Sequence, residues 1–297
     1  MNDAHRFWRV LRRDPFLLAC AAFLVAVVLL AFVGAAHTGY GYEKISDASL
    51  LPPTRLHWCG TDVHGRDLLT RTLYGARISL SIAAIASAVS LTVGVGYGMI
   101  SGYVGGRVDN VMMRAVEILY SLPTLILVIV LVTTLEPEAT ALLAWLGLRQ
   151  VPARIVLLFV FIGLTEWLTM ARIVRGQVLV LKEQPFLHAA QALGRSHAAI
   201  IARHLLPNVS GIILIYLTLT VPAVMLDESF LSFLGLGVQE PAASWGTLVA
   251  EAAGLLNPIH SYWWTLFFPG GMMTLTLLAL NFLGDGLRDA LDPRVRK

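Results

Sequence analysis

The sequence predicts an all-α polytopic membrane protein with six transmembrane helices. Of its 297 residues, 57% are hydrophobic and only 14% are charged, whereas about a quarter of the residues in an average soluble domain are charged. Six apolar stretches are separated by polar segments, and each approaches the ~20 residues that cross a bilayer as a helix. The formal net charge of +3 is too small to indicate a nucleic-acid-binding protein.

The first predicted span covers about residues 16–36. It follows an N-terminal segment with four arginines, namely Arg6, Arg9, Arg12 and Arg13. An apolar run of this length is long for the core of a cleaved signal peptide, so we expect an uncleaved signal anchor with a cytoplasmic N-terminus. The second predicted span, about residues 78–100, is rich in Ala, Ser and Gly, which suits close packing between helices.

Proline interrupts two of the predicted spans. The third span covers about residues 115–135 and contains Pro123, and the fifth covers about residues 209–225 and contains Pro222. A proline ring removes a backbone hydrogen bond and bends a helix. We therefore predict a kink in each of these two spans. Residues 136–154, after the third span, are predicted to form a loop with a short amphipathic piece.

The fourth predicted span, about residues 155–174, carries Glu166 at membrane depth. An ionisable group there faces a wet pathway or the protein interior. Of these two interpretations, a carboxyl hydrogen-bonded within the helix bundle is favoured over a pathway role. Residues 229–264 are predicted to form a folded extramembrane cap or a re-entrant piece, and the sixth span covers about residues 264–283.

The distribution of positive charge predicts the orientation in the membrane. With a cytoplasmic N-terminus, 15 Lys and Arg residues fall on the cytoplasmic side and 7 on the opposite side. Positive residues accumulate on the cytoplasmic side of membrane proteins. Both termini are therefore predicted to be cytoplasmic, together with the segment 184–208 between the fourth and fifth spans.

Residues 184–208 are predicted to form two short helices joined at Gly194. Helices are expected over about 186–193 and 196–205, because glycine enters left-handed backbone conformations without steric cost. Ser196 is expected to cap the second helix and Pro207 to end it. Such an elbow could pass force to a soluble partner, and an ordinary amphipathic loop at the membrane surface fits the pattern equally well.

The sequence lacks the motifs of an ATPase or an enzyme. A phosphate-binding loop needs a lysine after its glycines, and none of the three lysines follows a glycine. ATP must therefore be hydrolysed by another polypeptide. Residues 57–67 gather His, Cys and Asp side chains that could hold a soft metal ion. Turn formation explains this segment better, with Arg66 and Asp67 tying the loop to its own fold.

Three motifs resemble those of one transporter family. They are GTDVHGRDLLTRTLYGARIS at residues 60–79, LSFLGLGVQEPAASWG at residues 231–246 and GDGLRDALDPR at residues 284–294. The chain resembles the permease subunits of bacterial ABC importers for dipeptides, oligopeptides and nickel, and in particular the C-type subunit of the pair. The resemblance implies the type I ABC importer permease fold.

Segment 184–208 resembles the cytoplasmic EAA loop of this family. The matching residues are Ala189, Ala190, Gly194, Leu206 and Pro207. His188 stands where the family usually has Glu, and His204 where it usually has an apolar residue. The resemblance implies that this loop is the coupling helix that docks on the ATP-binding subunit.

The resemblance also implies the other subunits of the transporter. These are a periplasmic substrate-binding protein, a homologous B-type permease subunit and two ATP-binding subunits that bind ATP and Mg, so no cofactor is expected in this chain.

The resemblance also implies the division of the chain into domains. Residues 1–74 would hold the N-terminal cytoplasmic segment, the first helix and the periplasmic segment, residues 75–289 the permease domain, and residues 290–297 a cytoplasmic tail. The inner membrane of a bacterium is the implied location, with lipid around the spans.

Three alternatives remain. The same machinery could import nickel or another small solute, since cargo selection usually rests with the binding protein. A stand-alone secondary transporter is suggested by Glu166 and the six spans. An intramembrane enzyme would need a catalytic pair at membrane depth, and the sequence shows no partner for Glu166.

Overall fold

The computed structural model describes residues 14–149, 152–257 and 259–291, and its regular structure is helical. Within these residues, six helices are long and apolar enough to cross a membrane. This result confirms the predicted all-α class and the number of spans. The six helices are α2 (Pro15–Phe32), α3 (Leu68–Val104), α5 (Thr124–Trp145), α6 (Ala153–Lys182), α9 (Leu206–Phe233) and α11 (Trp263–Leu291).

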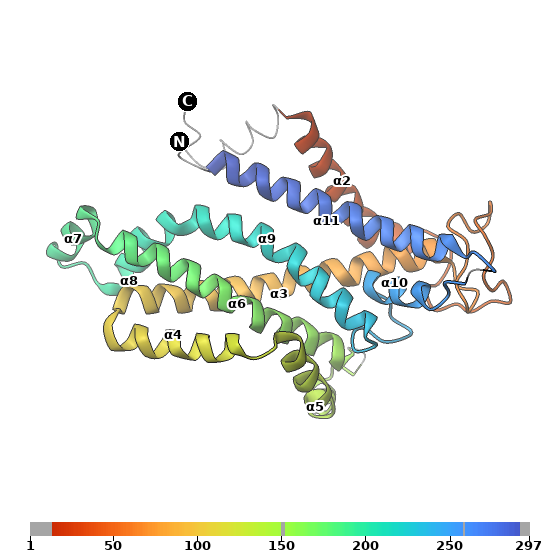
Figure 1. Ribbon diagram of the computed structural model, residues 1–297, viewed down its shortest axis with the longest axis horizontal. Helices are drawn as coiled ribbons and strands as arrows, with labels where there is room; N and C mark the ends of the chain where they lie inside the picture. Colours follow the sequence, from red (N-terminus) through yellow and green to blue (C-terminus); the bar gives the residue numbers. More distant parts are fainter. Residues whose placement is uncertain (1–13, 150–151, 258, 292–297) are drawn as a thin grey trace.

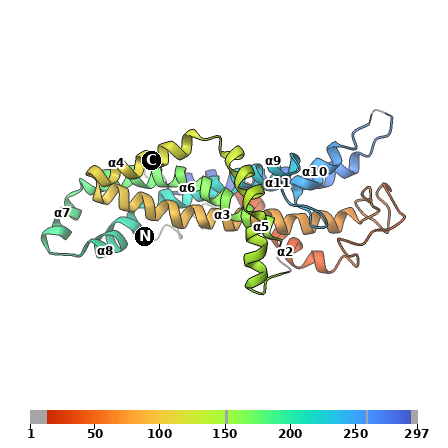
Figure 2. The ribbon, with the colours of Figure 1, turned by 90° about the horizontal axis from the view of Figure 1, so that it is seen from below.

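The molecule is elongated, and most of its long helices follow its long axis. Figure 1 shows α3, α6, α9 and α11 along this axis, with α2 beside α11. The exception is α5, which runs across the others in Figure 2. Shorter helices mark the ends: α7 (Pro185–Ala192) and α8 (His197–Ile200) lie at what we call the inner end, and α10 (Trp245–Ala253) lies with the 37–67 loop at the outer end.

Pro123 ends a helix instead of kinking one, so the predicted span 115–135 is wrong. One helix, α4, covers Gly106–Ser121, and α5 begins at Thr124. Pro123 occupies the N-cap position of α5 with an extended backbone, because the residues before and at a proline resist helical hydrogen bonding. The predicted 136–154 loop is also largely helical, since α5 continues to Trp145.

Pro207 does not end the second elbow helix, which is a second correction. It lies in the first turn of α9, where the missing N–H is tolerated. A π-helical turn, Ile201–Leu205, joins α8 to α9, so that one helical rod runs from His197 to Phe233. Pro222 lies inside α9, as predicted.

Two other boundaries differ from the prediction. The second span begins at Leu68 instead of about residue 78, because the Asp67 side chain caps α3 there. The predicted cap at residues 229–264 contains the end of α9, the helix α10 and the start of α11. The N-terminal arginines and most of the predicted tail 290–297 lie outside the described residues.

Small residues let α3 and α6 pack closely, as the composition of the second span predicted. Gly94, Gly98 and Gly102 recur at four-residue spacing and face α6. A Cβ atom on Gly98 would lie 2.5 Å from the Ala171 carbonyl oxygen, and one on Gly102 would lie 2.9 Å from the Val178 side chain. Only glycine therefore permits this backbone separation, which makes α3 and α6 the central pair of the bundle.

Candidate functional site: the inner elbow and the network at the outer end

The elbow at the inner end has the backbone that its sequence predicts. Helix α7 begins with Pro185 at its first position, and Gly194 has a φ of +71°. The left-handed region costs a residue with a Cβ atom roughly 1–2 kcal/mol. The Ser196 hydroxyl then accepts a hydrogen bond from the Ala199 backbone N–H at 3.3 Å and caps α8. Helix, glycine turn and capped helix are therefore confirmed.

Burial divides the elbow into an anchored face and a free face. Leu187, Ala190 and Ile200 are buried, and Leu187 and Ile200 pack against the bundle. His188 and Ala189 lie next to them in sequence and are exposed. Of the residues with a predicted coupling role, Gly194, Leu206 and Pro207 are also exposed, and His204 is half-buried. The buried Ala190 packs within its own chain, so a larger side chain there would displace the elbow itself.

An apolar cluster and one hydrogen bond hold the elbow to the spans. Leu187, Ile200 and Leu205 belong to a buried cluster with residues of α3 and α6, among them Met99, Tyr103, Val174 and Val178. The Tyr103 hydroxyl lies 2.8 Å from Nδ1 of His197. The elbow is therefore held mainly by dispersion and apolar burial, which carry little directional constraint.

The outer end is held by a network of ion pairs that the sequence alone did not reveal. The Arg71 side chain has no exposed surface and donates to Asp62 at 2.7 Å and to Glu251 on α10 at 2.6 Å. Arg66 donates to Asp62 at 2.6 Å and to Glu240 at 2.8 Å. The Arg66 guanidinium holds the pKa of Glu240 below its usual value. The Arg66–Glu240 and Arg71–Glu251 pairs join segments that are 174 and 180 residues apart in the chain.

The 57–67 loop uses its polar side chains for its own fold. Asp67 accepts hydrogen bonds from the backbone N–H and the hydroxyl of Thr70, at 2.9 and 2.8 Å, and lies 2.8 Å from Nδ1 of His57. Asp62 accepts from the Arg66 backbone N–H. The prediction that Arg66 and Asp67 tie the loop together is confirmed. Burial raises the pKa of the Cys59 thiol to about 11, which disfavours the thiolate that a metal would need.

Two of the sequence motifs meet around a buried carboxyl group. Glu228 on α9 is fully buried and accepts hydrogen bonds from the hydroxyls of Ser79, at 3.2 Å, and Ser232, at 2.7 Å. Ser79 in turn accepts from the Trp245 backbone N–H, and the Trp245 indole donates to the Thr72 carbonyl at 3.0 Å. These two sequence motifs thus encode one packed junction of α3, α9 and α10.

The predicted pathway residues lie outside the elbow and belong to different helices. Glu166 is half-buried in the middle of α6, Pro123 precedes α5, and Pro222 is buried in the second half of α9. Their predicted pathway or structural role stays a prediction.

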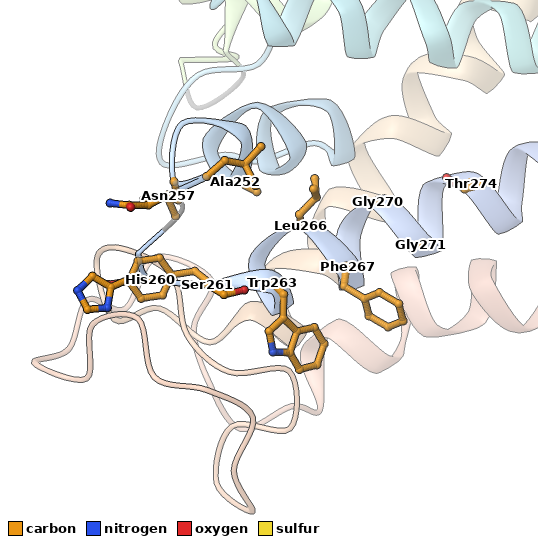
Figure 3. Close-up of a pocket in the computed structure, with 13 residues that line it drawn as sticks. Ala252, Asn257, His260, Ser261, Trp263, Leu266, Phe267, Gly270, Gly271 and Thr274 are labelled. Carbon is orange, nitrogen blue, oxygen red and sulfur yellow. The ribbon is translucent and has the colours of Figure 1, made fainter.

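Two cavities lie outside these regions, one near each end. The outer cavity, about 480 Å³, lies between α10 and the start of α11. Figure 3 shows Trp263, Leu266 and Phe267 lining it, with His260 and Asn257 at one end. The inner cavity, about 580 Å³, is polar and lies between α4 and α6. Sequence reasoning missed both cavities. The inner one joins residues 110–117 to residues 172–175, which are far apart in the chain, and the outer one depends on how α10 folds back against the start of α11.

The comparisons with known proteins agree with this architecture. A family model described as "binding-protein-dependent transport system inner membrane component" matches residues 94–297. The chain belongs to this family. It is accordingly a multi-pass inner-membrane component of a binding-protein-dependent ABC transporter, and the family's role in the transporter is non-catalytic. A system of this kind includes an ATPase and a binding protein.

Curated relatives of this permease cover nearly its whole length. A dipeptide transport system permease protein of Bacillus subtilis is 43% identical over 98% of this chain and 85% of its own length. An oligopeptide transport system permease protein of Escherichia coli K12 is 45% identical over 94% of this chain and 87% of its own. The predicted kinship with peptide importer permeases is thereby confirmed.

A solved structure supports the fold of the permease. The inward-facing MetNI methionine ABC transporter in its native crystal form contains a chain that aligns with a TM-score of 0.54 at 19% identity. The alignment covers 75% of this chain and 96% of that one. At this identity the likeness concerns the fold alone, and it agrees with the predicted importer permease fold.

Proposed function

We propose that this chain is the permease subunit of an ATP-driven importer of di- or oligopeptides, and that it forms half of the translocation pathway. Relatives named for dipeptide and oligopeptide transport, at 43% and 45% identity over nearly the whole chain, support this cargo class. Nickel or another small solute is the alternative cargo, because selection rests largely with the binding protein. Purifying the cognate binding protein and identifying its tightest ligand would decide between them.

The proposed assembly contains three other kinds of subunit. A homologous B-type permease would complete the pathway, two ATP-binding subunits would bind ATP and Mg, and a periplasmic substrate-binding protein would deliver the peptide. The charge count supports an orientation with both termini and the inner end in the cytoplasm. Co-purification of an ATPase with the chain would separate this proposal from a secondary transporter.

The elbow at residues 184–208 is proposed to dock on the ATPase. The observation that carries this role is its two-faced burial: Leu187 and Ile200 anchor it to the spans, while His188 and Ala189 on α7 are left exposed for a partner. A surface that only rested on lipid would need no such anchoring to α3 and α6.

Alternating access is the proposed mechanism. ATP-driven closure of the ATPase would move the elbow, and the elbow would tilt the spans that line the pathway between the two permease subunits. The break at Pro123 and the proline inside α9, Pro222, give those helices places to bend. Cysteine accessibility at Leu125 or Leu217 that reported only lipid in every state would contradict this pathway assignment.

The test measures peptide uptake and ATP hydrolysis in the complete transporter. We expect Gly194→Pro, or a bulky residue at Ala190, to abolish uptake while ATP hydrolysis continues, because the elbow no longer holds its docking geometry. His188→Glu should be tolerated. Gly147→Pro is the matched control, since Gly147 has a similar φ of +77° and donates to a carbonyl three residues earlier, as Gly194 does, but lies outside the elbow. Normal uptake in Gly194→Pro would contradict the assignment.

A further inference from the structure

The inner cavity between α4 and α6 has the shape and charge of a site for a small charged solute. Its volume is about 580 Å³. The residues that line it are Asn110, Met113, Arg114, Glu117, Arg172 and Arg175. Three guanidinium groups and one carboxylate therefore face a single space, with an amide and one apolar side chain between them.

The contacts between α4 and α6 place this cavity at the inner mouth of the bundle. Asp109 near the start of α4 binds Arg175, and Tyr120 near its end lies 3.0 Å from the hydroxyl of Thr169. The two helices are therefore antiparallel, and α4 covers only the inner half of α6 (Figure 1). Arg172 lies between these contacts, about 15 Å along α6 from its end at Lys182, after which the elbow begins.

The three arginines differ in how far the charge of each guanidinium group is already balanced by a carboxylate of the protein. Arg175 donates to both carboxylate oxygens of Asp109, at 2.5 and 2.6 Å, and is neutralised. Arg172 lies over the ring of Tyr120 at 4.2 Å, and among the described residues no carboxylate forms an ion pair with it. Arg114 reaches Glu117 only at 3.4 Å, and both are largely exposed, so this pair contributes little.

The unsatisfied groups fit the two ends of a peptide. A guanidinium offers a planar pair of donors that matches a carboxylate, and the stack on Tyr120 keeps the Arg172 plane in place. Glu117 in the same lining would repel a phosphate headgroup, whereas it would attract an ammonium group. A solute that carries both a carboxylate and an ammonium group satisfies all three side chains. Every unmodified peptide carries this pair at its termini, and in a di- or tripeptide the two ends lie within about 11 Å of each other, so that both reach one cavity.

We propose that this cavity binds short cargo peptides on their way to the cytoplasm, with Arg114 and Arg172 on the C-terminal carboxylate and Glu117 on the N-terminal ammonium group. The inference rests on the proposed peptide import and adds the residues of this chain that contact the cargo. Because recognition uses only the termini, it admits peptides of different side chains. The cavity thereby selects peptides with free termini, whatever side chains they carry.

The first test compares uptake of trialanine with uptake of trialanine amide by cells that contain the complete transporter. We expect Arg172→Gln and Arg114→Gln to lower uptake of the free acid about ten-fold, the scale of a lost charge-assisted hydrogen bond, and to change uptake of the amide less than about two-fold. Arg172→Lys should restore part of the loss. Arg107→Gln is the matched control, since Arg107 is exposed on α4 outside the cavity. Rates are normalised to the amount of transporter in the membrane.

A second measurement does not depend on delivery by the binding protein. Asn110→Cys, in a chain with Cys20 and Cys59 replaced, is labelled in the purified transporter with a water-soluble thiol reagent. Trialanine should slow the labelling, and neither trialanine amide nor N-acetyl-trialanine should do so to the same extent. In the Glu117→Gln background, protection by trialanine should fall to the level of the acetylated peptide.

The outcomes separate this inference from the proposed function. Equal loss of acid and amide uptake in the arginine variants, or equal protection by all three peptides, would overturn terminal recognition while peptide import stands. Protection by phosphatidylglycerol vesicles and not by peptide would assign the cavity to lipid. A wild-type transporter that imports no peptide would overturn the proposed function and this inference with it.

Discussion

The loop at the outer end and the elbow at the inner end are held in place by different interactions. At the outer end, buried charges join the 57–67 loop, the start of α3 and α10, and Arg71 reaches two carboxylates within 2.7 Å. At the inner end, the elbow rests on an apolar cluster and a single hydrogen bond between Tyr103 and His197.

This difference teaches where the chain can move. A buried ion pair demands a fixed geometry, because a small displacement leaves a charge without its partner in a low-dielectric medium. Apolar contacts tolerate sliding and small rotations, since their energy depends on area rather than direction. The outer end is therefore a rigid clamp, whereas the elbow can shift relative to α3 and α6 at a low energetic cost.

Breaking the outer network should have the largest effect. Arg71→Ala leaves the buried Asp62 short of one partner and Glu251 without any, which we expect to lower the free energy of unfolding by about 3 kcal/mol or more. The melting temperature of the detergent-solubilised chain measures this loss. Arg55→Ala is the control, because Arg55 lies exposed in the same outer loop. Equal melting of the two variants would show that the network is not a clamp.

Separating α3 from α6 should have the next largest effect. Gly98→Ala places a methyl group 2.5 Å from the Ala171 carbonyl oxygen and should cost about 1–3 kcal/mol. Gly96→Ala is a matched control on the same helix, since a Cβ atom there meets nothing within 4 Å, and it should be neutral or slightly stabilising. Thermal unfolding of both variants gives the comparison; a destabilised Gly96→Ala would contradict the packing described.

A weaker effect is expected at the inner end. Tyr103→Phe removes the hydrogen bond to His197, worth about 1 kcal/mol, and should speed amide hydrogen exchange in α8 and the π turn about five-fold. Tyr97→Phe is the control, because the Tyr97 hydroxyl donates to the Met112 carbonyl away from the elbow. Unchanged exchange at residues 197–205 would mean that the apolar cluster alone holds the elbow.

The smallest effect concerns pH at the outer end. Arg66 holds the pKa of Glu240 below its usual value of 4.5, so the ionised carboxylate contributes stability above that value. This contribution is lost as pH falls through the lowered pKa of the folded state. Because Glu240 is half-exposed, solvent screens the pair and the change is small. Unfolding followed from pH 6 to pH 3 should show a shallower acid loss in Glu240→Gln than in the wild-type chain.

Local chemistry predicted those parts of the structure that depend on neighbours in the sequence. The turn at Gly194 and the cap at Ser196 follow from backbone preference and a hydroxyl three residues from its partner. The apolar runs predicted the spans for the same reason. Proline was the exception. Pro123 separates α4 from α5, whereas Pro207 lies in the first turn of α9 within one continuous rod. The effect of a proline depends on whether its missing backbone N–H would have donated to the preceding turn.

Contacts between distant segments could not be predicted from one sequence. Arg66 and Glu240 lie 174 residues apart, and Asp109 and Arg175 lie 66 apart; no periodicity connects them. The inner cavity could not be predicted for this reason. In the sequence, Arg114 and Arg172 contribute only to the count of positive charge on the predicted cytoplasmic side. The docking face of the elbow was predicted from motif likeness, and its division into buried and exposed residues needed the fold.

The rod from His197 to Phe233 has mechanical proportions set by Pro222. The part from His197 to the proline is about 37 Å long and the part beyond it about 17 Å, at 1.5 Å per residue. A bend at Pro222 would make this rod a lever with arms in a ratio of about two to one, in which a large displacement of the elbow becomes a small one at the outer end. Glu228 and Ser232 lie on the short arm, where such a lever would favour precision over travel.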